Sequence, residues 1–201
     1  MESKIGIMGG TFNPIHLGHL ILAEEARNNL NLDKVIFIPT GTPPHKKRTS
    51  VLNPLYRYEM AVLATADNPY FQVSPIEINK EGISYTIDTI KYLKKIYTNS
   101  TLYFITGADS LVDICSWKNA SELLRLCKFA TAKRREISNV KLESTVNEIN
   151  QTYGESVYLL STPYIEISST DIRNRVKSGK SIKYYVSNNV ESYIVKNNIY
   201  K

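Results

Sequence analysis

The sequence is poor in the residues that hold a small secreted or metal-bound protein together. Its 201 residues include two cysteines, Cys115 and Cys127, and only three histidines. The cysteines do not form the close pairs typical of a zinc site. We therefore expect both to be small core residues in a reducing compartment, and the scarcity excludes a disulfide scaffold.

Long apolar runs are missing as well. No stretch of eighteen apolar residues occurs, so no transmembrane helix and no membrane partner are predicted. Residues 1–4 lead straight into a strand-like segment and lack the pattern of a signal peptide, which favours a cytoplasmic protein. No repeat, low-complexity tract or long linker divides the chain, so we expect one domain over residues 1–201.

Charge is modestly positive, with a formal net charge of +6. A positive balance suits a partner that carries several negative charges, such as ATP, RNA or DNA. The densest basic stretches, residues 45–48 and 133–135, are also typical of solvated loops.

Short apolar runs alternate with amphipathic segments of helical length. Strands are expected at 4–8, 35–38, 71–74, 102–106, 129–132 and 157–160. Helices are expected at 17–30, 54–66, 85–97, 109–114, 121–126, 140–153, 168–177 and 187–197, with Ser84 as the cap of the third. This alternation predicts an α/β fold, a doubly wound parallel sheet covered on both faces. In such sheets ligands lie beyond the carboxyl ends of the strands, here after Met8, Ile38, Thr106 and Ile167.

The turn after the first strand holds residues suited to binding phosphate. Residues 9–19 read Gly-Gly-Thr-Phe-Asn-Pro-Ile-His-Leu-Gly-His. The glycines allow a ligand to approach the backbone, and the following helix offers unpaired N–H groups and the positive end of its dipole. His16 and His19 share one side of that helix, where imidazoles can donate hydrogen bonds or carry positive charge. Two histidines could also bind a metal, but no third ligand is evident nearby.

A second motif, Ile-Ser-Ser-Thr-Asp-Ile-Arg at residues 167–173, lies where we expect the last strand to pass into a helix. Ser168 or Ser169 can cap that helix, and Asp171 fits a capping arrangement. Arg173 lies one turn inside the helix, where its guanidinium can reach an anion held by the hydroxyl and N–H groups.

Both motifs resemble the signatures of the nucleotidyltransferase superfamily. The resemblance implies a Rossmann-like sheet of the nucleotidyltransferase α/β phosphodiesterase type, with both motifs at one sheet edge. It also implies that ATP is bound by Gly9, Gly10, Thr11, Phe12, His16, His19, Gly107, Asp109, Ile167, Ser168, Ser169, Thr170 and Arg173.

Further segments resemble the bacterial nicotinate mononucleotide adenylyltransferases, from Gly9 to about Ile194. They are Pro43-Pro44-His45-Lys46, residues 84–89, Gly107-Ala108-Asp109-Ser110 and Trp117. The resemblance implies that Lys46 holds phosphate, that the helix start at Thr86 receives the nicotinate carboxylate, and that Trp117 stacks on the pyridine ring. The implied acceptor site comprises Asn13, His45, Lys46, Ser84, Tyr85, Thr86, Trp117 and Arg134.

The chain departs from the family pattern at two places. Arg134-Arg135-Glu136 stands where the family often has Arg-Pro-Gly, which weakens the assignment of Arg134 as a phosphate contact. Ser187 replaces a proline that is common before the last helix, a change that affects a helix start and not the chemistry.

The activity implied by the resemblance is transfer of AMP from ATP to nicotinate mononucleotide, in NAD biosynthesis. Mg²⁺ is expected on the triphosphate, held by ligand oxygens and water and not by a protein metal site. His16, His19, Lys46 and Arg173 are expected to align the two anions and stabilise charge, since no residue resembles an activated nucleophile.

Two other functions stay open. The acceptor could be nicotinamide mononucleotide or phosphopantetheine, because the motifs are shared. A non-catalytic RNA-binding protein is the other alternative, but the chain lacks room for a tRNA-binding domain and lacks aromatics on a basic strand face. We therefore expect no nucleic-acid partner. The sequence is compatible with a homo-oligomer and does not decide the oligomeric state.

Overall fold

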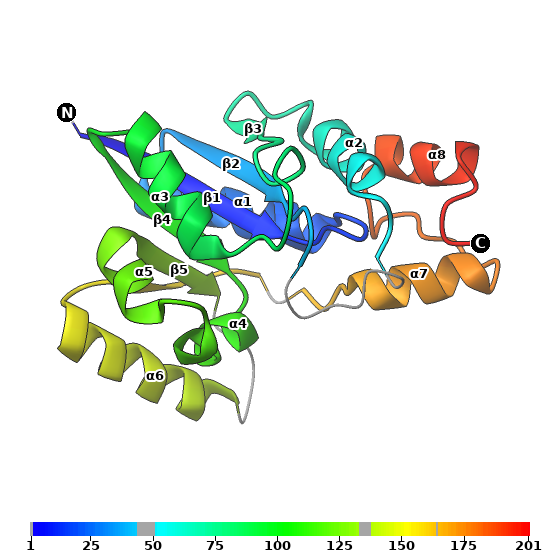
Figure 1. Cartoon of the computed structure of the whole chain (residues 1–201). Helices are drawn as coiled ribbons and strands as arrows, with labels where there is room; N and C mark the ends of the chain where they lie inside the picture. The colour runs from blue at the N-terminus through cyan, green and yellow to red at the C-terminus, as the bar shows by residue number, and fades with distance from the viewer. Residues whose placement is uncertain (1, 44–50, 133–137, 164) are drawn as a thin grey trace. The chain divides into compact units, whose positions relative to one another are not determined.

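The strands pair in one sheet, and helices occupy the segments between them (Figure 1). The computed structural model describes residues 2–43, 51–132, 138–163 and 165–201. Within them the strands are β1 (Ser3–Gly10), β2 (Lys34–Pro39), β3 (Phe71–Val73), β4 (Ser100–Thr106), β5 (Lys128–Ala132) and β6 (Val157–Leu160). The helices are α1 (Leu17–Leu30), α2 (Pro54–Thr65), α3 (Thr86–Ile96), α4 (Ala108–Val112), the 3₁₀ helix η2 (Ile114–Ser116), α5 (Ala120–Leu126), α6 (Ser138–Tyr153), α7 (Ser169–Lys177) and α8 (Asn188–Lys196).

The strand order identifies the topology. The strand order in the sheet is β3-β2-β1-β4-β5-β6. The chain therefore adds β2 and β3 on one side of β1, and then β4, β5 and β6 on the other side. The pairs β1–β4, β4–β5 and β5–β6 are parallel. The predicted α/β class with a doubly wound, Rossmann-like sheet is confirmed. In such sheets ligands bind beyond the carboxyl ends of the strands where the order reverses, here β1 and β4.

The chain divides into two compact units, each assembled from separate segments. The first unit comprises Met1–Gly9, Leu22–Ile36 and Tyr85–Tyr164, and the second comprises Gly10–Ile21, Phe37–Ser84 and Ile165–Lys201. Because each unit combines segments that are remote in the sequence, neither is a contiguous domain. That residues 1–201 form one domain stays a prediction.

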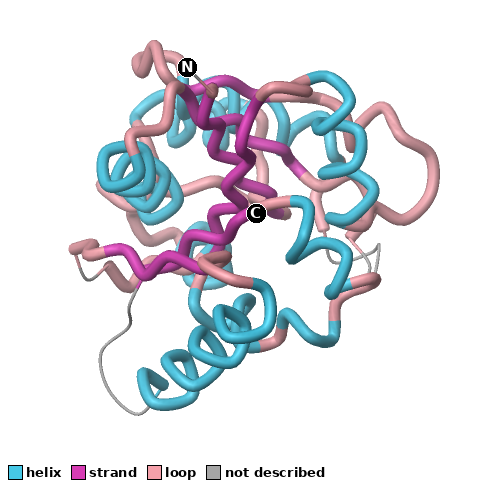
Figure 2. The backbone as a smooth tube through the Cα atoms, turned by 90° about the vertical axis from the view of Figure 1, so that its left-hand side faces the viewer, coloured by secondary structure: helices cyan, strands magenta, loops and turns pink. Residues whose placement is uncertain are grey.

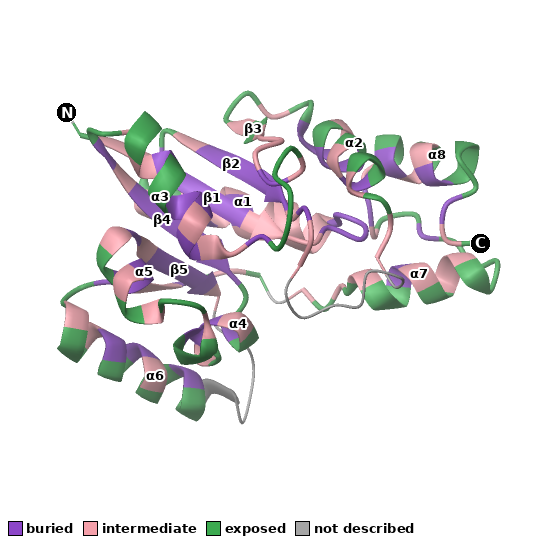
Figure 3. Ribbon diagram, in the orientation of Figure 1, coloured by how far each residue is buried: buried purple, intermediate pink, exposed green. Residues whose placement is uncertain are grey.

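The strands of the first unit, drawn in magenta in Figure 2, are largely buried, as the purple in Figure 3 shows. Ile7 of β1 lies beside Phe104 of β4, and Phe104 lies beside Phe129 of β5. All three side chains are buried, as expected for a parallel sheet with both faces covered. Gly6 is required by this packing, because a Cβ there would come within 2.9 Å of the side chains of Leu32 and Ile105.

The cysteines differ from each other in this unit. Cys127 is buried between the end of α5 and the start of β5, as expected. The prediction of a core position is wrong for Cys115, which is exposed. It lies in η2, where Ile114 is the buried residue, so the 3₁₀ turn directs its neighbour outward.

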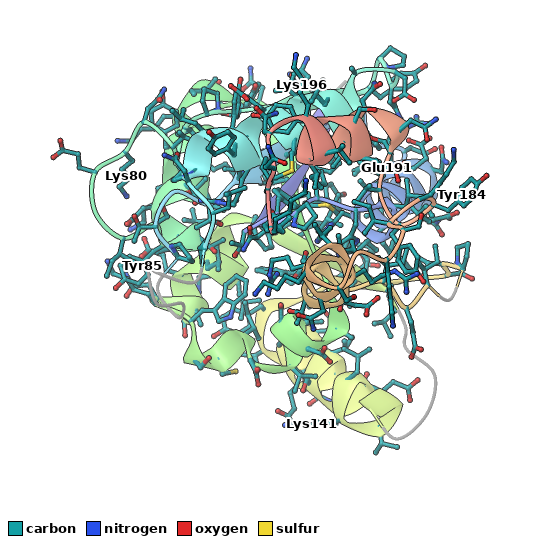
Figure 4. All side chains as sticks on the ribbon, turned by 90° about the vertical axis from the view of Figure 1, so that its right-hand side faces the viewer. Lys80, Tyr85, Lys141, Tyr184, Glu191 and Lys196 are labelled. Atoms are coloured by element: carbon teal, nitrogen blue, oxygen red, sulfur yellow. The ribbon has the colours of Figure 1, made fainter. Side chains whose placement is uncertain are left out.

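Helices α2 and α8 pack together in the second unit. α2 begins at the predicted residue, and α8 begins one residue later than predicted. The Asn53 side chain accepts a hydrogen bond from the N–H of Leu55 at 2.9 Å, directly before Pro54. The Ser187 hydroxyl accepts from the N–H of Val190, so the serine found in place of proline acts as a cap. Glu191 and Lys196 mark α8 in Figure 4. Across the described residues, no helix is both long and apolar enough to span a bilayer.

The predicted cap of α3 is wrong. Ser84 lies two positions before Thr86, the first residue of α3, and Tyr85 occupies the cap position without a side-chain hydrogen bond. Ser84 is instead in extended backbone, where its N–H donates to the carbonyl of Thr42 at 3.0 Å beside a parallel bridge between Thr42 and Ile83. Pairing with the segment after β2 therefore replaced capping.

Candidate active site

The first motif turns sharply after β1. Phe12 has φ of 47°, a left-handed conformation that is strained for a bulky residue. Its buried ring is held by an edge contact with His19, with ring centroids 5.0 Å apart, and by Phe37 at 6.1 Å. A Cβ on Gly10 would come within 2.8 Å of the Phe12 ring, so this turn requires glycine there.

The two histidines form one stacked pair at the start of α1. His16 directly precedes the helix and His19 lies in its first turn. Their ring centroids are 3.7 Å apart with an interplanar angle of 28°. The backbone N–H of His16 donates to Nδ1 of His19 at 3.2 Å. Because Nδ1 is an acceptor, neutral His19 carries its proton on Nε2, which makes Nε2 a donor for a phosphate oxygen.

Burial keeps this pair neutral in the free protein. Desolvation lowers the pKa of His16 from 6.5 to about 4. The pKa of His19 is also lowered, first by desolvation and then by repulsion from His16. Within the described residues, the buried Nδ1 of His16 has no hydrogen-bond partner. The pair can therefore supply donors or accept a proton when an anion arrives.

Hydrogen bonds connect the second motif directly to the first. The Ser169 hydroxyl donates to the carbonyl of Pro14 at 2.8 Å across 155 positions of sequence. Arg173 Nη1 donates to the carbonyl of Asn13 at 2.9 Å, and its Nη2 donates to the Thr170 hydroxyl at 3.1 Å. Both segments belong to the second unit. The structure thus brings residues 10–19 and 168–173 together, while a phosphate contact of Arg173 stays a prediction.

The start of α7 matches the expected capping arrangement. The Ser168 hydroxyl accepts from the N–H of Asp171 at 3.0 Å. One expectation about this segment is wrong, because the last strand does not run directly into the helix. Strand β6 ends at Leu160, and α7 begins only at Ser169. Ile167 is half-buried in the connecting segment.

A buried arginine that the sequence analysis missed supports the first motif. Arg57 of α2 is 0% exposed. Its guanidinium donates to three backbone carbonyls, those of Thr11 at 2.6 Å, Leu52 at 2.9 Å and Gly41 at 3.0 Å. No local pattern distinguishes this residue from a solvated helix arginine. Only the packing of the segments around Thr11 and Gly41 against it reveals its role.

A second missed residue is Tyr200. Its hydroxyl donates to the side-chain oxygen of Asn13 at 2.8 Å. Asn13 is 5% exposed and precedes Pro14 through a cis peptide bond. A lone tyrosine 187 positions away gives no sequence signal of this contact.

The remaining predicted site residues belong to the first unit or lie at its edge. Gly9 lies against Phe104, since a Cβ there would be 3.2 Å from the ring. Gly107 and Asp109 are exposed at the end of β4 and the start of α4. Trp117 is half-buried and meets Phe104 edge-on, with ring centroids 5.8 Å apart.

The start of α3 combines several features that favour an anion. Thr86 is its first residue, and the side chain of Tyr85, the cap residue, makes no hydrogen bond to the start of the helix. The Lys118 ammonium lies over the Tyr85 ring, 4.1 Å from the centroid. A helix start and a nearby cation both attract a carboxylate.

Three predicted residues, His45, Lys46 and Arg134, lie outside the described part of the chain. Ser84 is described, and it is buried in the second unit with no hydrogen-bond partner for its hydroxyl among the described residues. The described residues contain no group of three or more histidine, cysteine, aspartate or glutamate side chains arranged to hold a metal ion.

Comparison with known proteins agrees with this geometry. The model of the family described as "Cytidylyltransferase-like" matches residues 7–175, a range that contains both motifs. A Thermoanaerobacter protein named "Probable nicotinate-nucleotide adenylyltransferase" is 51% identical over 201 residues, which cover 100% of this chain and 95% of that protein. A protein of the same name from Moorella thermoacetica is 48% identical over 98% of this chain and 92% of its own length.

Solved structures share the fold. The Plasmodium falciparum nicotinic acid mononucleotide adenylyltransferase in complex with NaAD superposes with a TM-score of 0.79, and the complex with APC gives 0.77. Each alignment covers 98% of this chain and 97% of the other chain at 21% identity, so this likeness concerns the fold. The extent of the sequence matches shows that the chain belongs to the cytidylyltransferase-like family and, within it, to the nicotinate-nucleotide adenylyltransferases.

Proposed function

We propose that this protein transfers the AMP part of ATP to nicotinate mononucleotide, giving nicotinate adenine dinucleotide and pyrophosphate. The observation that carries the proposal is the pair of hydrogen bonds that Ser169 and Arg173 donate to the turn before the stacked histidines. Two segments with phosphate-binding chemistry are thereby held at one place. The names of the relatives support the same activity. Because both substrates are soluble nucleotides, we propose the cytoplasm as the compartment.

The reaction needs positioning more than activation. A phosphate oxygen of the acceptor attacks the α-phosphorus of ATP, the bond from that phosphorus to the bridging oxygen of the β-phosphate breaks, and pyrophosphate leaves with the bonding electrons. The acceptor phosphate is ionised at neutral pH, so no general base is required. Catalysis then comes from alignment of two anions and stabilisation of the charge that develops on pyrophosphate.

The histidine pair suits that task. The donor on His19 Nε2 is fixed by the bond to Nδ1, and the stacked His16 restrains the ring. A preorganised donor stabilises developing charge without reorganisation during the reaction. The approach of the triphosphate favours protonated imidazole, so bound ATP is expected to raise the lowered pKa values of both rings.

A divalent metal ion enters this scheme as part of the substrate. We propose Mg²⁺ bound to the triphosphate, where it neutralises charge on the leaving pyrophosphate. Oxygen atoms of ATP and water supply most of its ligands.

The first unit offers features that match the nicotinate part of the acceptor. The start of α3 at Thr86, with Lys118 nearby, suits a carboxylate. The half-buried Trp117 ring suits a flat pyridine ring. These features favour nicotinate over nicotinamide mononucleotide, because the amide carries no negative charge.

The test is a pyrophosphate-release assay with ATP, Mg²⁺ and each acceptor in turn. We expect kcat/KM to be highest with nicotinate mononucleotide. Equal activity with nicotinamide mononucleotide would refute the carboxylate assignment. Turnover with phosphopantetheine alone would refute the proposed acceptor altogether.

A further inference from the structure

The guanidinium of Arg57 joins two turns that follow neighbouring strands of the sheet. Its Nη1 donates to the carbonyl of Thr11, after β1, at 2.6 Å, and its Nη2 donates to the carbonyl of Gly41, after β2, at 3.0 Å. Its Nε donates to the carbonyl of Leu52 at 2.9 Å, which fixes the plane of the guanidinium. Because this group is planar and rigid, one side chain sets the distance between the two turns.

The two turns also meet through their backbones. The N–H of Thr40 donates to the carbonyl of Gly10 at 2.8 Å. Gly41 lies so close to the backbone of Glu77 that a Cβ on it would be 2.1 Å from the carbonyl oxygen of Glu77. The turn after β2 is thus packed tightly, and Arg57 ties it to the turn after β1.

Each turn leads to residues predicted to bind a different substrate. Thr11 belongs to the first motif, which the resemblance assigns to ATP, and it directly precedes the strained Phe12. Gly41 directly precedes Thr42, whose carbonyl accepts a hydrogen bond from the N–H of Ser84 at 3.0 Å. The resemblance assigns Ser84 to the acceptor. Arg57 therefore connects a segment predicted to bind ATP with one predicted to adjoin the acceptor.

Arg57 is suited to keep this connection rigid. It is fully buried, so water does not compete for the three carbonyls. Burial lowers its pKa from 12.5 to about 10, although Tyr200 and Glu77 favour the charged form, and the guanidinium stays charged at neutral pH. Hydrogen bonds from a charged donor are stronger than those from a neutral one.

We propose that Arg57 is a positioning residue for adenylyl transfer: it holds the turn at Thr11 and the turn at Gly41 in the relative placement that lets the acceptor phosphate attack the α-phosphorus of ATP. The kinetic consequence rests on the proposed function, whereas the connection between the turns does not. A misplacement of about 1 Å between two reacting groups can lower a rate about a hundredfold. A looser connection should therefore lower kcat more than it weakens the binding of either substrate.

The first experiment compares R57K with M60A, a matched control. R57K keeps the positive charge, but an ammonium cannot reproduce the planar fork that bonds three carbonyls. Met60 is a fully buried apolar residue of the same helix, so M60A destabilises the fold by a cavity and leaves the three hydrogen bonds of Arg57 in place. Both variants are assayed well below their denaturation midpoints.

We expect kcat for pyrophosphate release to fall about ten- to a hundredfold in R57K, while calorimetric Kd values for a non-hydrolysable ATP analogue and for nicotinate mononucleotide change less than about threefold. M60A should keep the wild-type kcat and Kd values. Equal losses of kcat in the two variants would overturn the proposal, because the effect would then be merely structural. An unchanged kcat in R57K, or a loss confined to the Kd values, would overturn it as well.

Hydrogen exchange tests the connection without turnover. The Thr40 N–H, which bonds one turn to the other, should exchange about three- to tenfold faster in R57K than in M60A, the size expected when one hydrogen bond is weakened. Equal exchange rates in the two variants would overturn the proposal. If the wild-type protein releases no pyrophosphate with nicotinate mononucleotide, the proposed function fails, and the exchange rates alone then decide whether Arg57 joins the turns.

Discussion

At the scale of single residues, the histidine pair combines fixed geometry with a lowered proton affinity. His16 restrains the ring of His19 by stacking and fixes its tautomer through a backbone hydrogen bond. The spacing in the sequence was enough to predict that the two rings lie together. Their stacking and the accepting Nδ1 depend on the backbone path through the strained Phe12, which no spacing rule provides.

His19→Ala removes the proposed donor to the leaving group. We expect kcat to fall by about two decades or more, as for other preorganised charge-stabilising donors. The assay is pyrophosphate release at saturating ATP and acceptor, with circular dichroism to verify the fold. Turnover close to the wild-type value would exclude His19 from the chemistry.

His16→Phe keeps an aromatic ring but removes its titration. In the wild-type protein the pKa of His16 lies at about 4, below its ordinary 6.5, so the unfolded state binds more protons between these values. The contribution of neutral His16 to the free energy of unfolding is therefore fully present above about pH 6.5. It is lost as the pH falls toward 4, and the loss amounts to at most about 3 kcal/mol. Urea unfolding at several pH values should show that wild-type stability falls more steeply over this range than that of the variant. Parallel curves would contradict the lowered pKa.

Arg57 and Tyr200 show where sequence reasoning ends at this scale. Each residue is an ordinary member of its local segment, and each acquires its role from carbonyl or amide groups far away in the chain. Trp117 is the opposite case, because the sequence predicted a role for it. Its ring is half-buried, so the contact with the pyridine ring stays a prediction.

At the scale of helices and strands, local chemistry determined most boundaries. The predicted range of α1 is identical to the observed one, and Ser168 caps α7 as expected. Asn53 and Ser187 cap α2 and α8. Ser84 was the exception, since pairing with Thr42 placed it in extended backbone. Tertiary pairing of this kind overrides a local preference.

Ser168 and Ser187 make the same kind of cap on different helices, α7 and α8. We expect S168A and S187A each to lower the free energy of unfolding by about 1 kcal/mol, the usual cost of a lost cap. Only S168A should also weaken ATP binding, because only α7 carries the second motif. Denaturant unfolding and calorimetry with an ATP analogue check both statements. Equal ATP affinity in the two variants would contradict a phosphate role for the start of α7.

Arg57→Met tests how three segments are held together. The variant keeps much of the side-chain volume but leaves three carbonyls, those of Thr11, Gly41 and Leu52, without their donor. An unsatisfied buried polar group costs about 1–3 kcal/mol, so we expect the free energy of unfolding to fall by at least about 3 kcal/mol. R57K, with its single ammonium, should recover only part of it. A loss below about 1 kcal/mol in R57M would contradict this role for Arg57.

At the scale of the whole molecule, the alternation of apolar and amphipathic segments was sufficient to predict a doubly wound parallel sheet. The order β3-β2-β1-β4-β5-β6 follows the topology expected for such sheets. The division into two units built from interleaved segments was not predictable, because it depends on packing between parts of the chain that are remote in sequence. The same holds for the bonds that join Asn13 and Pro14 to α7.

The most direct measurement is a crystal structure of the protein with Mg²⁺ and a non-hydrolysable ATP analogue. One triphosphate should touch both segments, with a phosphate oxygen about 3 Å from His19 Nε2 and another at the same distance from Arg173 or from a hydroxyl of residues 168–170. A triphosphate that contacts only one of the two segments, or neither, would contradict the account.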